Sequence, residues 1–166
     1  MDILRRASFS RCGQYRYQLS RQWEKGDGHC VFIGLNPSTA DAYTDDPTIR
    51  RCMDFTQRWG YSWMTMVNLF AFKTPHPALL KKAEDPEGSN NRRVLRRHCA
   101  SANLIVAAWG AHGTYANQAQ RLAGIWADVP VHCFGLTKSG QPLHPLYQRS
   151  DAKLVSFSTR NPPTRS

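Results

Sequence analysis

The chain has 166 residues, with 22 lysines and arginines against 12 aspartates and glutamates, which gives a formal net charge of +10. This length suits one domain, and a hydrophobic fraction of 41% excludes wholesale disorder. No apolar run reaches the roughly 18 residues of a membrane span, and the N-terminus carries no apolar signal core. We therefore expect a single domain over residues 1–157 with a flexible tail over 158–166. We also expect a cytoplasmic monomer that does not contact a membrane.

Arginine makes up most of the basic excess, with 16 Arg against 6 Lys. A guanidinium group forms bidentate pairs with phosphates and stacks on bases, so this balance favours an anionic polymer as the partner. A solvated positive surface, common in small basic proteins, would produce the same counts. On charge alone, we expect a nucleic acid, most simply DNA.

The cysteines give no sign of a metal site. There are five of them, an odd number, and no two form a Cys-x-x-Cys pair. This spacing argues against a zinc ribbon and against an iron–sulfur cluster. Cys30 and Cys133 lie in apolar runs, where a buried free thiol is expected. We therefore expect neither a metal nor a cofactor.

Strand patterns recur along the chain. Tyr15, Tyr17 and Leu19 alternate with polar residues, which is typical of a half-buried strand. The next run, 30–33, is continuously apolar, as in a strand buried on both faces. Similar runs follow at 63–70, 103–108 and 131–135, and a short last one lies at 154–157.

Helix patterns lie between these strands. Asp46 followed by Pro47 predicts an N-cap and first turn, and Gly60 would end that helix. Ser89 is a candidate cap for a second helix, and Thr114 would open a third. Alternating strands and helices are typical of a parallel sheet. We therefore expect an α/β fold, a three-layer sandwich with a central, mostly parallel four-stranded sheet and helices on both faces.

Polar and aromatic side chains lie near the carboxyl ends of four successive predicted strands or in the segments that follow them: Asn36, Asn68, Trp109 and His144. Ligands of such sheets bind beyond the carboxyl ends of the strands, so these side chains are expected to converge on one crevice. Each also has a purely structural interpretation. Asn36 can cap a turn, Asn68 can be a satisfied buried amide, Trp109 can belong to the core and His144 can be a loop residue.

These residues resemble motifs of the uracil-DNA glycosylase superfamily. Gly34-Leu35-Asn36-Pro37-Ser38 resembles its first motif, particularly the Gly-x-Asn-Pro-Gly of the mismatch-specific branch. Asn68 resembles the strand-end asparagine that reads the flipped base. Ala108-Trp109-Gly110 resembles its Trp-Gly strand end, and His144-Pro145 its His-Pro-Ser motif. The resemblance implies the fold of that superfamily.

The chain is also similar, over roughly Tyr15 to Phe157, to a family of small, functionally unassigned bacterial and phage proteins. The motif from Gly34 to Asp41, GLNPSTAD, and the segment Asp45-Asp46-Pro47-Thr48 carry this similarity.

The glycosylase resemblance implies an enzyme that extrudes a damaged or modified base from DNA and hydrolyses its N-glycosidic bond. Asn68 would then hydrogen-bond the base edge. His144 would donate a hydrogen bond to the departing base, and Asn36 would hold the attacking water. Asp41 is the nearest carboxylate in the motif and a candidate base, although a turn or cap role suits it as well.

Other residues are candidates for holding the base or the polymer. Phe70, Tyr43 and Trp109 are aromatic residues that could stack on the base or belong to the core. Candidates for the backbone phosphates are Ser38, Lys138, Gly140 and the arginines Arg92, Arg93, Arg96 and Arg97. The arginines are spaced by four along a predicted helix, where a solvated face is the alternative.

The sequence departs from the glycosylase motifs at two positions. Ser38 replaces the mismatch-specific glycine, and Leu146 and Tyr147 replace the small residue after His144-Pro145. Leu146 or Tyr147 could wedge into the duplex. Two alternatives stay open: a non-catalytic nucleic-acid or nucleotide-binding module that uses the same pocket, and a hydrolase of free nucleotides.

Overall fold

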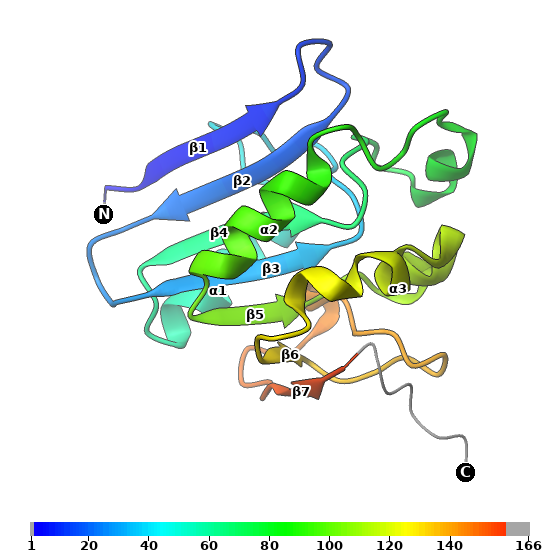
Figure 1. The fold of residues 1–166 in the computed structure, drawn as a ribbon. Coiled ribbons are helices and arrows are strands. Elements are labelled where there is room, and N and C mark those ends of the chain that lie inside the picture. The colour runs from blue at the N-terminus through cyan, green and yellow to red at the C-terminus, as the bar shows by residue number, and fades with distance from the viewer. Residues whose placement is uncertain (1, 159–166) are drawn as a thin grey trace.

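The apolar run 30–33 forms β3 (His29–Gly34), which is buried along its whole length at the middle of the sheet. The computed structural model describes residues 2–158. On one side of β3 lies β4 (Trp63–Asn68), and on the other lie β5 (Leu104–Ala107) and β6 (Val131–Cys133). These four strands are parallel, and the register pairs Gly34 with Asn68 and Ile33 with Ala107. Their carboxyl ends therefore meet at one edge (Figure 1).

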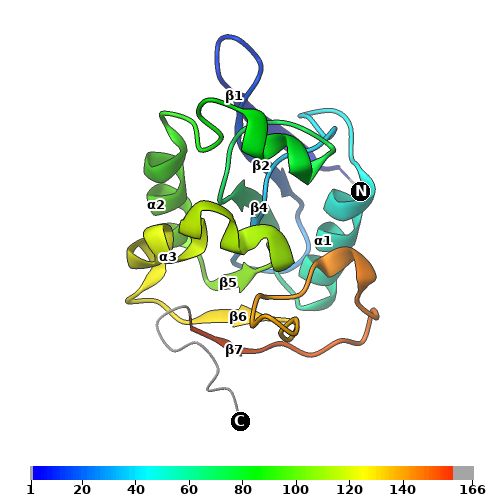
Figure 2. The same ribbon diagram turned by 90° about the vertical axis from the view of Figure 1, so that its right-hand side faces the viewer.

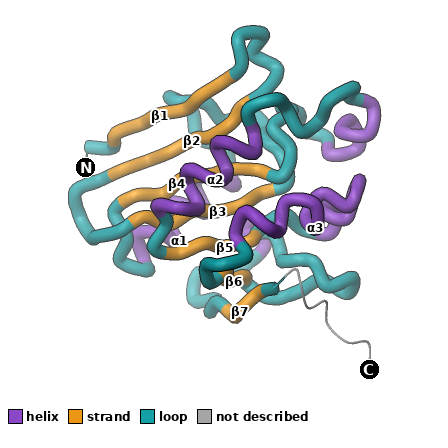
Figure 3. The backbone as a smooth tube through the Cα atoms, in the orientation of Figure 1, coloured by secondary structure: helices purple, strands orange, loops and turns teal. Residues whose placement is uncertain are grey.

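Antiparallel strands extend this sheet on both sides. β1 (Leu4–Phe9) pairs with β2 (Arg16–Gln22), and β2 pairs antiparallel with β4. At the other edge β7 (Val155–Phe157) pairs antiparallel with β6. The order is β1-β2-β4-β3-β5-β6-β7, and Figure 3 shows the seven strands as one continuous sheet.

The prediction of a mostly parallel four-stranded sheet of the uracil-DNA glycosylase type is therefore wrong, although the α/β class is consistent with the structure. The seven-stranded sheet is mixed. The misjudged parts are the two edges. β2 and β7 overlap predicted strands that the expected four-stranded sheet left out, whereas β1 is largely exposed and carries Arg5 and Arg6, so no apolar alternation marks it as a strand. β1 becomes a strand because it pairs with β2 across the hairpin at 10–15, and no local pattern in the sequence encodes this pairing.

Helices cover both faces of the sheet, as Figure 2 shows. On one face α1 (Pro47–Arg58) covers a cluster that includes Phe32, Met64 and Phe134. On the other, α2 (Asn91–Ser101) and α3 (Gln118–Leu122) cover a cluster that includes Val31, Val67 and Trp126. Short 3-10 turns lie at η1 (Pro77–Lys82), η2 (Ala111–Asn117), η3 (Ala123–Trp126) and η4 (Pro145–Tyr147).

The helix predicted after Asp46 is confirmed. The Asp46 carboxylate accepts a hydrogen bond of 2.8 Å from the backbone N–H of Ile49, and Pro47 occupies the first turn. Both features satisfy or remove N–H groups that lack partners at a helix start. Ile49, Cys52 and Thr56 are buried against the sheet. Asp46 is thereby held at the start of α1, at a fixed position beside the sheet edge.

The helix predicted from Thr114 is wrong as a single element. The backbone leaves helical geometry at Tyr115, and Ala116 and Asn117 adopt left-handed conformations with φ of 54° and 56°. The segment is therefore split into η2, α3 and η3. Tyr115 still packs against the core, and Ala119, Leu122 and Trp126 are buried. These four residues therefore face the core although the backbone that carries them is interrupted.

Four of the cysteines are buried free thiols, Cys30 and Cys133 among them as predicted, while Cys12 is exposed. Within residues 2–158, none of the helices has the length and apolar character needed to cross a bilayer. The predicted tail lies, apart from Ser158, outside the described residues.

Candidate functional site

A cavity of about 510 Å³ opens where β3, β4 and β5 end. Its volume falls within the range of roughly 300–1,000 Å³ typical of small-molecule sites. The structure brings together there the four side chains predicted to converge, Asn36, Asn68, Trp109 and His144, along with Ser38. Arg16 and Asp46 also line the cavity. The edge onto which the parallel strands open is thus the candidate site.

Asn36 is oriented by the loop that follows β3. Its Nδ2 donates to the carbonyl oxygens of Pro37 at 3.0 Å and Thr74 at 2.9 Å. A third carbonyl, that of Phe72, lies at 3.4 Å. Because these bonds engage the nitrogen of the amide, the oxygen Oδ1 is the atom left to accept a hydrogen bond at the cavity. Asn36 therefore presents an acceptor of defined orientation.

Asn68 is the last residue of β4 and is 2% exposed. Within residues 2–158, its Nδ2 is buried without a hydrogen-bond partner. A buried amide N–H that lacks an acceptor costs about 1–3 kcal/mol. The backbone carbonyl of Asn68, in contrast, accepts a bond from Asn91 Nδ2 at 2.9 Å, which fixes the end of the strand to α2. The cavity wall thus contains a buried donor that a ligand can satisfy.

His144 precedes η4 and is half-buried. Its Nδ1 accepts a hydrogen bond of 3.2 Å from the backbone N–H of Leu146, so in the neutral ring the proton lies on Nε2. Burial lowers the pKa of His144, an effect that nearby Asp46 partly offsets. At neutral pH His144 is therefore an uncharged imidazole with an Nε2–H to donate.

Trp109 contributes both to the core and to the cavity wall. It is 2% exposed and packs against Trp126 and Phe157, with ring centroids 5.8 Å and 5.5 Å away. Its Nε1 donates to Gln141 Oε1 at 2.8 Å, so the indole is held in place. Close packing over Gly113 leaves no room there for a Cβ atom. Trp109 is thus a rigid wall of the cavity.

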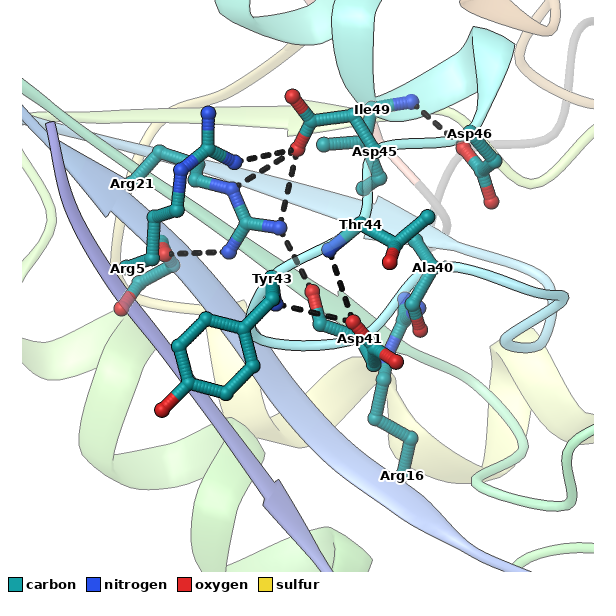
Figure 4. Close-up of polar contacts among 11 residues, drawn as sticks. Arg5, Arg16, Arg21, Ala40, Asp41, Tyr43, Thr44, Asp45, Asp46 and Ile49 are labelled. Atoms are coloured by element: carbon teal, nitrogen blue, oxygen red, sulfur yellow. Dashed lines mark hydrogen bonds and ion pairs between the residues drawn. The ribbon is translucent and has the colours of Figure 1, made fainter.

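The loop between β3 and α1 is tied to the sheet by arginines (Figure 4). Arg21 on β2 is fully buried, donates from Nε to Asp45 Oδ1 at 3.0 Å and from Nη2 to the Asp41 carbonyl at 2.7 Å. Arg5 on β1 also bonds Asp45 Oδ1 at 3.0 Å. Because Asp45 precedes Asp46, these two ion pairs fix the segment that places Asp46 at the cavity.

Three candidates lie away from the cavity lining. Asp41 Oδ1 accepts from the backbone N–H groups of Tyr43 at 2.9 Å and Thr44 at 2.8 Å, and these bonds lower the pKa of Asp41. The Tyr43 side chain is 87% exposed on the same loop. Phe70 is 1% exposed and packs against Tyr115 within the core. Asp41 organises a turn in this structure, the Tyr43 ring is in solvent and the Phe70 ring is in the core.

The predicted phosphate contacts are spread over the molecule. Ser38 lines the cavity, whereas Lys138 and Gly140 lie in the loop after β6, with Gly140 beside a second, smaller hollow. The arginines are on α2, which covers the face opposite α1 (Figure 2). Arg92 forms an ion pair with Glu87 at 3.0 Å, and the other three are exposed: Arg93, Arg96 and Arg97.

Sequence reasoning missed Arg16 and assigned Asp46 only to a cap. Arg16 stands between Tyr15 and Tyr17 in an alternating pattern that points it to solvent, yet it is 2% exposed. The register of the β1–β2 pairing shifts at this end of β2, where Arg16 is buried instead of facing solvent. No local signal in the sequence reveals this burial. Asp46 was identifiable as a cap, and its second role at the cavity wall depends on the tertiary placement of α1.

Within the described part of the chain, no three His, Cys, Asp or Glu side chains gather in a group that could hold a metal ion. The cavity therefore offers amide, imidazole and guanidinium groups, with Asp46 as its carboxylate. Such groups can bind and orient a polar ligand and donate hydrogen bonds to it.

Comparison with known proteins identifies the chain by family. No curated protein and no solved structure matches it. One family model, described as "Protein of unknown function (DUF1643)", matches residues 16–146. That stretch contains Asn36, Asn68, Trp109 and His144, and it agrees with the predicted similarity to a functionally unassigned family. The remoter resemblance to the uracil-DNA glycosylases stays a prediction. The chain belongs to the DUF1643 family of proteins of unknown function.

Proposed function

We propose that this protein is a DNA glycosylase-like enzyme that hydrolyses the N-glycosidic bond of a damaged or modified base held in the cavity. One observation carries the proposal. A single cavity contains the oriented acceptor of Asn36, the unpaired buried donor of Asn68 and the neutral imidazole of His144. A base presents donors and acceptors along one edge, and the reaction needs a held water and a donor to the departing base.

The proposed step breaks the bond between C1′ of the sugar and the ring nitrogen of the base. The electron pair of that bond passes to the base, and a hydrogen bond from His144 Nε2–H stabilises the charge on a base oxygen. Water held by Asn36 Oδ1 attacks C1′ and releases its proton to solvent. An amide orients water without deprotonating it, so the reaction depends on a good leaving group. Asn68 Nδ2 would donate to an acceptor on the base edge.

The rim of the cavity suits a nucleic acid strand. Leu146 and Tyr147 line it, and Tyr147 is 82% exposed with its ring 5.8 Å from that of His144. An exposed ring beside the cavity can stack on a neighbouring base or fill the place of the extruded one. We therefore propose that DNA crosses the sheet edge along Tyr147, with one base in the cavity.

A base-release screen tests the proposal. Single-stranded and duplex oligonucleotides, each with one damaged or modified base, are incubated with the protein, and abasic sites are revealed by alkaline strand scission. We expect scission with at least one substrate. His144→Ala and Asn36→Ala are each expected to lower its rate by about 10²–10³-fold, the usual cost of removing one such donor or positioning group. His76→Ala, an exposed histidine nearby, serves as the control. Absence of abasic product from every substrate would contradict the proposal.

A second candidate is a binding module that holds a nucleotide or nucleic acid in the same cavity without cleaving it. Asp41, the predicted base, favours this candidate because its Oδ1 is engaged in a turn and it lies outside the cavity lining. Binding that His144→Ala weakens, without base release by the unaltered protein, would support the module over the enzyme.

A further inference from the structure

Arg16 is a buried arginine whose charge has no carboxylate partner in the described structure. Only 2% of the residue is exposed, and it lines the cavity. Nη1 donates to the carbonyl oxygen of Ala40 at 3.0 Å. Within residues 2–158, the buried Nε has no hydrogen-bond partner, and the ion pairs involve other arginines. Arg16 thus places at the cavity wall a positive charge that forms no ion pair among the described residues.

A buried charge is costly unless an opposite charge or several hydrogen bonds compensate it. Burial lowers the pKa of Arg16 to about 10, a shift that the charges of Asp46 and Asp41 oppose and that of Arg21 increases. Arg21, on the same strand, is a buried arginine whose charge is compensated by an ion pair. Its guanidinium pairs with Asp45 at 3.0 Å. Arg16 therefore differs from Arg21 in that no carboxylate of the described residues forms an ion pair with it.

The bond to Ala40 does not account for the whole side chain. A guanidinium carries five N–H donors in a planar fork, and the Ala40 carbonyl engages only one nitrogen. A fork with free donors matches two oxygens of an oxyanion. A single donor is enough to hold the loop at Ala40. The other N–H groups of Arg16 and its positive charge are therefore suited to binding an anionic ligand.

A second unpaired donor lies on the same cavity. The Nδ2 of Asn68 is buried without a partner among the described residues, and β4, which ends at Asn68, neighbours β2, which begins at Arg16. Because β2 runs antiparallel to β4, these two residues lie at the same edge of the sheet. Two unsatisfied buried donors at one cavity point to a ligand rich in oxygen acceptors.

We infer that Arg16 binds a phosphate group of the ligand, so that the cavity takes a phosphorylated sugar with its base and not a neutral base or nucleoside. The identity of the base and sugar rests on the proposed function, whereas the oxyanion site rests on Arg16 itself. A phosphodiester of a DNA strand and the 5′-phosphate of a free nucleotide present the same oxygens to the guanidinium. Both sources satisfy the inference, and the probes below distinguish them.

The test uses probes that need no knowledge of the base. Thermal unfolding of the full chain is followed with inorganic phosphate, with 2-deoxyribose 5-phosphate, and with a short single strand that carries a stable abasic analogue, all at constant ionic strength. Ligands that bind only the folded state raise the unfolding temperature. Stabilisation by the sugar phosphate indicates a free nucleotide as the ligand, and stabilisation by the strand alone indicates a backbone phosphate.

Variants of Arg16 decide whether that binding uses the proposed site. Arg16→Met is expected to weaken binding by about 10- to 100-fold, the cost of a charge-assisted hydrogen bond. Arg16→Lys keeps the charge without the planar fork, and its affinity is expected to lie between those of Arg16→Met and the unaltered protein. This variant keeps the test decisive if Arg16→Met fails to fold. Arg58→Lys is the control, since Arg58 is an arginine of α1 that pairs with Asp54 at 3.0 Å and lies outside the cavity lining, and it is expected to bind as the unaltered protein does.

Two results would overturn the inference: no stabilisation by any of the three phosphate probes, or equal binding by Arg16→Lys and the unaltered protein. Failure of the proposed function is a separate outcome. Arg16-dependent binding without base release overturns the enzyme alone, and base release that Arg16→Lys leaves unchanged overturns the phosphate site alone.

Discussion

A Cβ atom built on Gly34 would lie 2.8 Å from Oδ1 of Asn68, and only 3.3 Å from Sδ of Met66. Gly34 and Asn68 are register partners at the ends of β3 and β4, so the Asn68 amide lies against the backbone of β3. A Cβ atom at position 34 would force the Asn68 side chain to shift, so glycine there leaves the room that this amide occupies. This glycine allows the Asn68 amide to lie across the end of β3, beside the cavity.

Gly34→Ala is expected to displace the Asn68 side chain and weaken ligand binding by about tenfold, the loss of one hydrogen bond. The melting temperature should fall only slightly, because the displaced group is a side chain at the sheet edge. Gly124→Ala is the control, since no heavy atom lies within 4 Å of a Cβ built there. Titration of each variant with the ligand found in the base-release or phosphate test measures the change. Equal affinity of both variants would contradict the role given to Asn68.

The activity or binding of the cavity is expected to fall at acid pH because of His144. Its protonation places a hydrogen on Nδ1, which then faces the backbone N–H of Leu146 instead of accepting from it. Because burial lowers the pKa of His144, the folded protein keeps the neutral ring to a pH below the ordinary histidine value of about 6.5. We expect a pH–activity profile that is flat around neutrality with its acid limb below that value. In His144→Gln, this limb should disappear along with most of the activity.

The exposed arginines of α2 give a prediction about salt. If Arg93, Arg96 and Arg97 contact phosphates, changing all three to Gln will make duplex binding less sensitive to salt. The slope of log K against log salt should become shallower by about 0.9 for each lost contact. The control is a triple variant that removes the same charge elsewhere on the surface by changing three exposed lysines to Gln: Lys25, Lys82 and Lys153. Anisotropy titrations at several salt concentrations compare the two triple variants, and identical slopes would assign these arginines to a solvated face.

Stability is expected to depend on pH through His29, at the opposite edge of the sheet. Its ring is 2% exposed, stacks on Trp63 with centroids 3.6 Å apart, and bonds Thr65 Oγ1 at 2.7 Å. Burial, together with nearby His98, lowers the pKa of His29 to about 4. The unfolded chain, with a histidine pKa of about 6.5, therefore binds the proton more readily between these two values.

The free energy of unfolding should be highest above about pH 6.5 and should decline as the pH falls toward 4, with His29 contributing about 1 to 3 kcal/mol of the loss. Urea unfolding at a series of pH values measures this. His29→Gln is expected to be less stable at neutral pH but to lose less on acidification, and exposed His76→Gln should keep the full decline. A parallel decline in all three proteins would show that other groups cause it.

Much of the candidate site follows from the order of residues along the chain. Strand ends carry Asn36, Asn68, Trp109 and His144, and parallel strands bring their carboxyl ends to one edge whatever the rest of the fold does. Arg16 could not be found in this way. Its neighbours in sequence mark it as a solvent-facing residue, and only the pairing of β2 with β4 and the loop carbonyl of Ala40 enclose it.

The sequence by itself determined the local elements: the apolar runs of β3 to β6, and α1 with its Asp46 cap and Pro47 first turn. Their patterns arise from burial and capping within a few residues, so they are legible without the fold. Only the tertiary structure decided the antiparallel edges of the sheet and the break at Ala116 and Asn117. It also decided the burial of an unpaired Arg16 at the cavity wall. These features depend on which distant backbone supplies each hydrogen bond, and no local run of residues carries that information.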